Sequence, residues 1–515
     1  MSELPSTPLT LSGGPLTIAE LVEVARHGRQ VAIGPSSREA INRARAVVDD
    51  VAGGADPVYG VNTGFGSLSQ HRIAPADVEA IQRNIVRSHA AGVGDPLPVE
   101  VVRAMLIALS ASLARGASGV QLDTVKALMT ILNNGVTPIV PKVGSVGASG
   151  DLAPLAHAAQ VLLGEGEVVV DGVRMSGETA VAKGHVEPVH LRAKEGLALL
   201  NGTHLMAGTC ALSLHDAGNV LHAAVVAAAM AVDACRGSVG PFDDRIHALR
   251  PQASQRGIAA ALCRLLDGST IIPDHLNDDP RVQDPYSLRA APQVIGAVAD
   301  ALGHSTSIIE AELSSITDNP LVVQGPDALE LVSGANFHGM PLALAADSAI
   351  TALCHLAGIA ERRIFWVLSG HDPHTQVPDY LSPQPGLHSG LMIVQYTAAA
   401  ACNELRALAY PASVGNISTS AGIEDYNSMG ATSARRLRQA VQLTMNVIAM
   451  ELLVMAEGLD HQRPLRSGDG VEAMHAAVRQ RVEPLGADRS PAPDIAALAI
   501  AIGEGSLPIV GLEAS

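Results

Sequence analysis

Aromatic and charged side chains are scarce in this chain. Of its 515 residues, only 2% are Phe, Trp or Tyr and 17% are Asp, Glu, Lys or Arg, whereas 47% are hydrophobic. The core must therefore be built mainly from Ala, Leu, Val and Ile, of which Ala and Leu favour closely packed helices. So few charges leave much apolar surface on a monomer of this size, which favours an oligomer.

Positive charge is also in short supply. Lys and Arg number 34 against 51 Asp and Glu, a net charge of −17, with no basic block. This balance argues against nucleic acid or an anionic membrane as a partner. The cysteines are odd in number and form no CxxC pair, so we expect reduced residues of a cytoplasmic protein and neither disulfides nor a zinc site.

No targeting or membrane segment is predicted. The stretch "MSELPSTPLTLSG" lacks a basic and an apolar region, so we expect no export signal. The most apolar stretch, "VLHAAVVAAAMAV", is expected to be too short to cross a bilayer and to form a buried bundle helix.

Helical periodicity is abundant. Val78, Ile81 and Ile85 recur at steps of three and four in a helix expected to open at Pro75. The next helix is expected to end with Gly116 as its C-cap. Longer helices are expected around residues 191–235, 292–316, 338–368, 388–410 and 431–458.

Strand signals are few. "EVVVDGVRM" predicts a hairpin that turns at Asp171-Gly172, and "LVVQGPDALELV" predicts a second. The fold is therefore expected to be mainly α, with a smaller mixed N-terminal region, 1–190, and a long-helix bundle, 191–515.

The tripeptide Ala-Ser-Gly occurs twice, at residues 117–119 and 148–150. By residue type alone, both sites are explained as helix boundaries, with Ser118 as a cap and a helix starting near Asp151. Neither is a G-x-S-x-G serine-hydrolase motif, because the final glycine is missing. The second differs in its approach, "VTPIVPKVGSVG", where prolines stiffen the chain and glycines permit unusual dihedral angles.

The second site and several other motifs resemble one enzyme family. "VGSVGASGDLAPLAH", "YGVNTGFG", "LLNGTH", "VQDPYSLRAAPQ" and "SGANFHGMP" are similar to the signatures of the aromatic amino acid ammonia-lyases and the related aminomutases. The resemblance covers most of the chain. It implies a homotetramer with active sites shared between chains, an amino acid as substrate, and no metal.

The resemblance also implies a cofactor made from the chain itself. In the family, Ala148, Ser149 and Gly150 would cyclise to 4-methylidene-imidazole-5-one. The glycine nitrogen attacks the alanine carbonyl, and loss of water leaves a methylene group on the former serine. Glycine offers an unhindered nitrogen, alanine does not crowd the ring, and serine supplies the leaving oxygen. The product is an electrophile, which no ordinary side chain provides. On this interpretation Ser118 is only a cap.

Further roles follow from the same motifs. The resemblance implies catalytic roles for Tyr59, Tyr286 and Glu424 besides the tripeptide. It implies substrate binding by His89, Asn201, Gln283, Arg289, Phe337 and Met392. Tyr59 would be the base that removes the β-proton, which requires nearby charge or dipoles to lower its pKa.

The start of the helix expected at Pro285 offers a geometric reason why three of these residues would act together. With Asp284 as N-cap and Pro285 in the first turn, Gln283, Tyr286 and Arg289 would lie on one side. Arg289 would then clamp the substrate carboxylate with two hydrogen bonds.

The substrate is predicted from three positions. The pair Ser88-His89, Glu424 and Met392 resemble the members that act on histidine, whereas phenylalanine lyases have Phe-Leu, Gln and Lys there. A carboxylate suits an imidazole, which offers an N–H donor. The expected reaction is elimination of ammonia from L-histidine to trans-urocanate, the first step of histidine degradation.

Several alternatives stay open. Met340, Ile423, Tyr426 and His204 depart from the pattern of the histidine members, so another aromatic amino acid lyase or a 2,3-aminomutase is possible from the sequence. A metal hydrolase using His371, His374 and His388 would need closely grouped ligands with supporting carboxylates. A catalytically dead helical scaffold would keep Ser149 unmodified.

Overall fold

The computed structural model describes residues 7–54, 56–277, 279–370 and 372–508. Within these residues the chain divides into two compact units. Unit 1 comprises Met1–His215, Ser305–Asp347 and Pro411–Arg435, and unit 2 comprises Asp216–His304, Ser348–Tyr410 and Arg436–Ser515. This division differs from the expected boundary at residue 190 because four long helices begin in one unit and end in the other. They are α9 (His204–Ala234), α14 (Ala291–Leu313), α15 (Met340–Leu368) and α17 (Gly430–His461).

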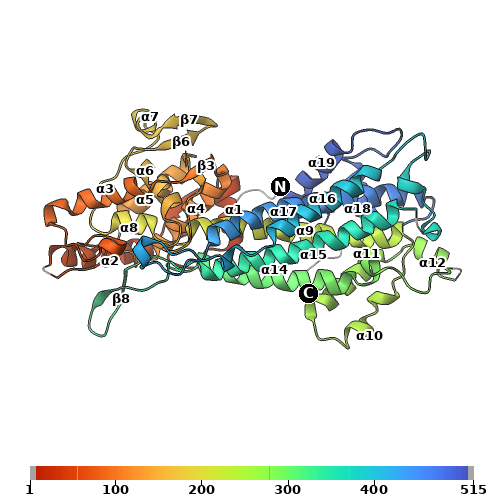
Figure 1. The fold of residues 1–515 in the computed structure, drawn as a ribbon, viewed down its shortest axis with the longest axis horizontal. Helices are drawn as coiled ribbons and strands as arrows, with labels where there is room; N and C mark the ends of the chain where they lie inside the picture. The colour runs from red at the N-terminus through yellow and green to blue at the C-terminus, as the bar shows by residue number, and fades with distance from the viewer. Residues whose placement is uncertain (1–6, 55, 278, 371, 509–515) are drawn as a thin grey trace. The chain divides into compact units, whose positions relative to one another are not determined.

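Unit 1 mixes short helices and strands, as expected of the N-terminal region (Figure 1). Its own helices are α1 (Ile18–His27), α2 (Pro35–Gly53), α3 (Val78–His89), α4 (Val99–Ala114), α5 (Leu122–Asn133), α6 (Leu152–Leu162), α7 (Gly177–Ala182) and α8 (Glu195–Leu200). Its strands are β1 (Leu9–Leu11), β2 (Val31–Ile33), β3 (Val93–Pro96), β4 (Thr137–Pro138), β5 (Pro141–Val143), β6 (Glu167–Val170), β7 (Val173–Ser176), β8 (Leu321–Gln324) and β9 (Leu329–Val332).

Helix α4 lies at the centre of unit 1, where it packs against α1, α2 and α5. Every residue from Val101 to Ala114 is buried, so the helix is covered on all sides and not on one face only. Gly116 follows it with φ of +72° and donates its N–H to the carbonyl of Leu113. The C-cap residue is Arg115 and not Gly116 as predicted, because the left-handed glycine typical of a helix end lies one residue beyond the cap.

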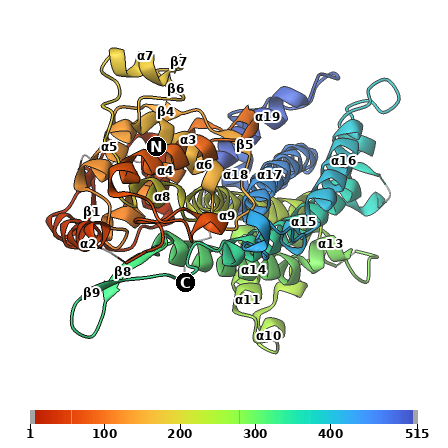
Figure 2. The same ribbon diagram turned by 60° about the vertical axis from the view of Figure 1, so that its left-hand side comes forward.

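Both predicted hairpins are present. Strands β6 and β7 pair antiparallel across Asp171 and Gly172, whose φ angles of +50° and +77° suit a tight hairpin turn. Strands β8 and β9 form the second hairpin, whose turn points away from the helices of the unit (Figure 2). The three-residue parallel pair of β1 and β2 was not predicted.

Ser118 does not act as the predicted helix cap. Its side chain is fully buried, and its Oγ has no hydrogen-bond partner in the described part of the chain. The residue that precedes α5 is Gln121. Helix capping therefore explains neither the hydroxyl nor the burial of Ser118.

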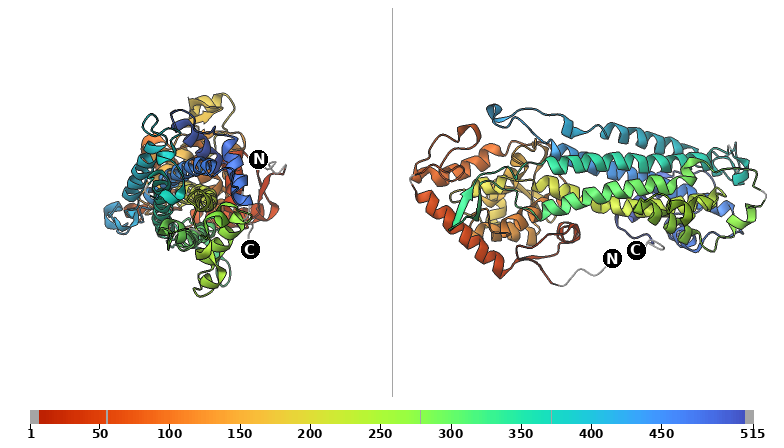
Figure 3. Two further views of the ribbon diagram at one scale, coloured as in Figure 1. Left: turned by 90° about the vertical axis from the view of Figure 1, so that its right-hand side faces the viewer. Right: turned by 90° about the horizontal axis from the view of Figure 1, so that it is seen from below.

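The regular elements in the described part of unit 2 are all helices. Besides its parts of the four long helices, it contains α10 (Asp244–His247), α11 (Ala253–Leu266), α12 (Ile271–His275), α13 (Tyr286–Arg289), α16 (Met392–Leu408), α18 (Asp469–Arg479) and α19 (Ala492–Gly503). Its long helices run side by side with aligned axes (Figures 1 and 3). This is the expected long-helix bundle.

Three described helices are long and apolar enough to cross a membrane by length and composition. They are α9, α15 and α17, with mean hydropathies of 1.5, 1.6 and 1.4 in their most apolar windows. The expectation that the apolar stretch in α9 is too short for a bilayer is therefore wrong, because it lies within a helix of 31 residues. Inside the protein, 78%, 67% and 78% of these windows are buried, as in core helices of a bundle.

Candidate active site

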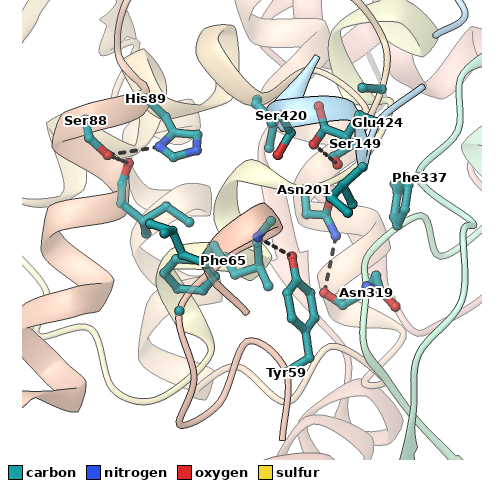
Figure 4. Close-up of a pocket in the computed structure, with 18 of the residues that line it drawn as sticks. Tyr59, Phe65, Ser88, His89, Ser149, Asn201, Asn319, Phe337, Ser420 and Glu424 are labelled. Carbon is teal, nitrogen blue, oxygen red and sulfur yellow. Dashed lines mark hydrogen bonds between the residues drawn. The ribbon is translucent and has the colours of Figure 1, made fainter. Parts of the chain in front are cut away.

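The second Ala-Ser-Gly tripeptide lies at a cavity in unit 1. The cavity has a volume of about 660 Å³, and Ala148 and Ser149 are in its wall. Figure 4 shows Ser149 beside Glu424, with Asn201 and Phe337 nearby and with Tyr59 and His89 also in the wall. Four of the five quoted motifs, which are far apart in the chain, therefore meet at one cavity.

Main-chain bonds tie the tripeptide to the segment that carries Asn201. The N–H of Gly202 donates to the carbonyl of Ser149 at 3.2 Å, and the N–H of Asp151 donates to the carbonyl of Gly202 at 2.8 Å. These two bonds form a short parallel bridge between Gly150 and Gly202. The bridge fixes the position of the tripeptide without using a side chain.

Position 150 requires glycine. Its φ is +73°, which side chains rarely permit, and a Cβ there would lie 2.0 Å from the carbonyl oxygen of Gly202. No hydrogen bond within the described residues engages the N–H of Gly150. The Gly150 nitrogen is therefore not engaged in a hydrogen bond with these residues and is available to form a new covalent bond.

Asp151 is the N-cap residue of α6, at the predicted start of that helix, but its carboxylate binds the main chain of another helix, α9. The side chain makes no capping bond to α6. It accepts hydrogen bonds from Ser145 Oγ at 2.9 Å and from the N–H of Met206 at 3.0 Å, in the first turn of α9. Burial raises the pKa of Asp151 to about 6 despite these hydrogen bonds.

Glu424 forms the direct side-chain contact to Ser149. Ser149 Oγ donates to Glu424 Oε1 at 3.3 Å, and Thr419 Oγ1 donates to the other carboxylate oxygen at 2.7 Å. Ser420 and Ala421, just before Glu424, have φ of +49° and +54°. Two consecutive left-handed residues that are not glycine are costly, and such backbone is concentrated at functional sites.

Tyr59 enters the cavity from a glycine-rich loop. Its hydroxyl oxygen accepts a hydrogen bond from the N–H of Gly66 at 3.4 Å. Burial raises the pKa of Tyr59, the Gly66 N–H opposes this rise, and the carboxylates of Glu424 and Asp318 add to it. The lowered pKa that a tyrosine base requires is therefore not produced by the described residues of one chain.

His89 ends α3 at the cavity and is held by its neighbour. Ser88 Oγ lies 3.0 Å from His89 Nδ1 and donates its hydrogen to the carbonyl of Ile85 at 3.2 Å. Burial lowers the pKa of His89, which favours a neutral ring with one nitrogen as donor and the other as acceptor.

The residues around Pro285 form a different hollow, in unit 2. Gln283, Tyr286 and Arg289 line it together, as expected from their spacing, and its volume is about 420 Å³. Tyr286 is 78% exposed. Met392 begins α16 and lines neither hollow.

The predicted capping role of Asp284 is wrong. Its carboxylate is buried and accepts a hydrogen bond from the N–H of Ser238 at 2.8 Å. Pro285, and not Asp284, is the N-cap residue of α13. The Asp284 carboxylate therefore ties the start of this helix to the segment that follows α9.

The departures from the histidine pattern lie at and near the cavity. Tyr426 stacks on His338 with ring centroids 6.4 Å apart, and Ile423 also lines the wall. His204 is buried, which lowers its pKa to about 4. Met340 begins α15.

Sequence reasoning missed Asn319, which lines the same cavity. Asn319 follows Thr317 and Asp318, and all three are buried. Three consecutive polar residues after a long helix usually indicate an exposed loop, so their burial carried no signal in the sequence.

The metal alternative gains no support from the described residues. They contain no group of three or more His, Cys, Asp or Glu side chains that could hold a metal ion. His371 lies outside the described residues.

A mainly helical fold with a small tripeptide, a tyrosine and a carboxylate around one cavity fits the site that the family resemblance implies for a carbon–nitrogen lyase. The chain belongs to the aromatic amino acid lyase family, because the model of that family matches residues 16–480.

Relatives and solved structures agree with this family. A histidine ammonia-lyase of Sorangium cellulosum is 46% identical over 503 residues, which cover 96% of this chain and 98% of that protein. A solved histidine ammonia-lyase of Trypanosoma cruzi has a TM-score of 0.88 at 36% identity, covering 97% of this chain and 94% of that one. A tyrosine aminomutase of Streptomyces globisporus has a TM-score of 0.91 at 36% identity, covering 97% of both chains.

Proposed function

We propose that this enzyme eliminates ammonia from L-histidine to give trans-urocanate, the first step of histidine degradation. The observation that carries the proposal is the carboxylate of Glu424, bonded to Ser149 at the cavity that His89 also lines. An imidazole substrate offers an N–H to this carboxylate, whereas a phenyl ring offers none. The names of similar proteins support the same substrate.

The proposal includes a 4-methylidene-imidazole-5-one formed from Ala148, Ser149 and Gly150. Ring closure joins the Gly150 nitrogen to the Ala148 carbonyl carbon and releases one water, and the Ser149 hydroxyl leaves as a second. The free Gly150 N–H and the glycine-only geometry at this position fit that closure. When formed, the group supplies an electrophile that makes the amino group a better leaving group.

The chain's own residues then bind the substrate and move its protons. Tyr59 takes the β-proton, and Asn201 holds the amino group. Phe337 packs beside the tripeptide. His89 and Glu424 select the imidazole ring, with Glu424 as a charged acceptor for the ring N–H. Met392 would complete the substrate pocket, as the family resemblance implies.

A second copy of the chain completes the site in this proposal. Among the described residues that line the cavity there is no Lys or Arg, so nothing there clamps the substrate carboxylate. Arg289 lies with Gln283 and the exposed Tyr286 in the other hollow. We therefore propose a homotetramer in which another subunit supplies these three residues. Their positive charge and hydroxyl would also lower the pKa of Tyr59.

The enzyme is proposed to act in the cytoplasm. All five cysteines are free among the described residues, which supports a reducing compartment.

The test compares Ser149→Ala with Ser118→Ala on a panel of histidine, phenylalanine and tyrosine. Ultraviolet absorbance detects the conjugated acid that each substrate would give. Ser149→Ala is expected to lose urocanate formation and the mass change of two lost waters. Ser118→Ala is a matched control, because removing a buried hydroxyl with no partner is near neutral for stability.

Other outcomes would point elsewhere. A cinnamate or coumarate signal without urocanate would replace histidine by another aromatic substrate, and a β-amino acid product would indicate a 2,3-aminomutase. An unmodified Ser149 in an inactive wild type would favour a dead scaffold. Equal loss in both variants would show a folding defect and contradict the role of Ser149.

A further inference from the structure

Two charged side chains near the cavity are completely buried. Lys194 Nζ lies 2.6 Å from Asp318 Oδ2, and the two side chains are 0% and 1% exposed. A lysine is almost never buried to this extent. Because a buried ion pair costs much of its attraction in lost hydration, its presence is weak evidence of a stabilising role. Neither residue lines the cavity, so any role in the reaction is indirect.

The second oxygen of Asp318 contacts a residue that does line the cavity. Asn201 Nδ2 donates to Asp318 Oδ1 at 3.3 Å and to the carbonyl of Asn319 at 3.3 Å (Figure 4 shows the contact to Asn319). Both partners can only accept hydrogen bonds, so the amide nitrogen of Asn201 must face them. The amide oxygen then lies on the opposite side of the group, with no hydrogen-bond partner among the described residues.

The segment that holds Asn201 is itself anchored. The N–H of Asn319 donates to Asp318 Oδ1 at 2.6 Å, and the N–H of Gly334 donates to Asn319 Oδ1 at 2.7 Å. The N–H of Thr203 donates to Thr317 Oγ1 at 3.4 Å. Residues 317–319 therefore hold the Asn201 segment at two points, by main-chain and side-chain bonds.

We propose that Lys194 and Asp318 are positioning residues that fix the amide of Asn201 with its oxygen toward the amino group of the substrate. In this arrangement Lys194 holds one carboxylate oxygen of Asp318, and the other oxygen accepts from the amide nitrogen of Asn201. The inference rests on the proposed function, in which Asn201 binds the substrate amino group.

Removing Lys194 breaks this arrangement for an electrostatic reason. A buried carboxylate that loses its partner is costly, so the Asp318 side chain is expected to turn toward other donors. Its Oδ1 then no longer accepts from Asn201, and the amide keeps only its contact to the Asn319 carbonyl. With one of its two bonds lost, the amide oxygen is held less firmly toward the amino group of the substrate.

A double-mutant cycle tests the inference. The variants are Lys194→Met, Asn201→Ala and the two together, with kcat and KM for L-histidine measured at constant pH. Each single change is expected to lower kcat/KM by about tenfold or more, the loss of one hydrogen bond to a charged group. The double variant is expected to lose no more than Asn201→Ala alone, because Lys194 acts through that residue.

A second variant pair separates positioning from folding. Lys194→Met/Asp318→Asn keeps a neutral acceptor for Asn201 and leaves no buried charge, so it is expected to recover most of the activity lost in Lys194→Met. This double variant also tests the inference if Lys194→Met alone does not fold. Arg103→Met is the matched control in the same unit, since Arg103 is buried and donates only to main-chain carbonyls of α1 and α5. It is expected to lower the melting temperature with kcat/KM unchanged.

The outcomes distinguish this inference from the proposed function. Additive losses in the cycle, with a wild type active on histidine, overturn the role of Lys194 and Asp318 only. A Lys194→Met variant with normal kcat/KM does the same. If the wild type acts on another aromatic amino acid, kcat and KM of the same variants are measured with that substrate. A wild type inactive on all three amino acids overturns both.

Discussion

Replacing Glu424 by Gln keeps the size of the side chain and removes its negative charge. In the structure, Glu424 accepts one hydrogen bond from Ser149 at 3.3 Å and one from Thr419 at 2.7 Å. A glutamine oxygen still accepts from Thr419, so the local turn is expected to persist. The change therefore isolates the charge that the proposed function uses to bind an imidazole N–H.

The expected loss follows from the kind of bond removed. A hydrogen bond to a charged group contributes about 1.5–3 kcal/mol, against about 1 kcal/mol for a neutral one. Loss of its full value corresponds to a fall of about 10- to 150-fold in kcat/KM for histidine. Phenylalanine has no ring N–H, so any activity on it is expected to be unchanged or higher.

Glu424→Gln is expected to shift the pH profile of activity to lower pH. The Glu424 carboxylate raises the pKa of Tyr59. Because the base must be deprotonated, activity rises with pH through the pKa of Tyr59, and Glu424→Gln shifts this rising limb to lower pH. The loss for histidine is therefore largest at high pH, where both enzymes have an ionised Tyr59.

The assay is urocanate absorbance across pH for the wild type, Glu424→Gln and Asp425→Asn. Asp425 is the exposed neighbour in the same loop, so its change matches the charge lost without the bond to Ser149. Mass spectrometry checks that each variant still loses two waters from the tripeptide. An unchanged kcat/KM for histidine in Glu424→Gln, with the tripeptide modified, would refute the substrate reasoning.

Two further predictions concern backbone geometry and burial. Gly150→Ala is expected to abolish activity, because its Cβ would lie 2.0 Å from the carbonyl oxygen of Gly202. Gly172→Ala also has a positive φ but meets open space, so it should cost only about 1 kcal/mol of unfolding free energy. Equal losses of activity in the two variants would contradict this reasoning. Burial raises the pKa of Asp233 from 3.8 to about 6, so its stabilising contribution is complete below about pH 4 and is lost as pH rises through about 6, a loss of about 3 kcal/mol. Asp233→Asn should remove that part of the pH dependence in urea unfolding between pH 4 and 7, and parallel curves for the two proteins would count against it.

Local sequence patterns predicted most of the helices and both hairpins. The left-handed Gly116 marks the end of its helix to within one residue, and Asp171-Gly172 turns the first hairpin, because their backbone angles are local properties. The pair of β1 and β2 was missed, since three residues are too few for a periodic signal. Ser118 looked like a cap because its neighbours in sequence resemble a helix start, whereas its burial depends on distant elements.

Which residues line the cavity could be predicted only from the resemblance to the family. Ser149 and Glu424 are 275 positions apart, and no local pattern joins residues at that distance. The pKa of Tyr59 was expected to be lowered and is raised, because burial and two carboxylates outweigh one N–H. The pair Lys194 and Asp318 had no signal at all, since a lysine before an apolar helix is usually exposed.

The main-chain bridge between Gly150 and Gly202 has a consequence for how such enzymes diverge. It holds the tripeptide through backbone atoms alone, while the side chains that the proposed function assigns to ring selection stand on α3 and on the loop before α17. Under that proposal, replacements at Ser88, His89 or Ile423 retune the preferred substrate and leave the tripeptide undisturbed. One scaffold can in this way support lyases and aminomutases with different substrates, as the similar structures with both names illustrate.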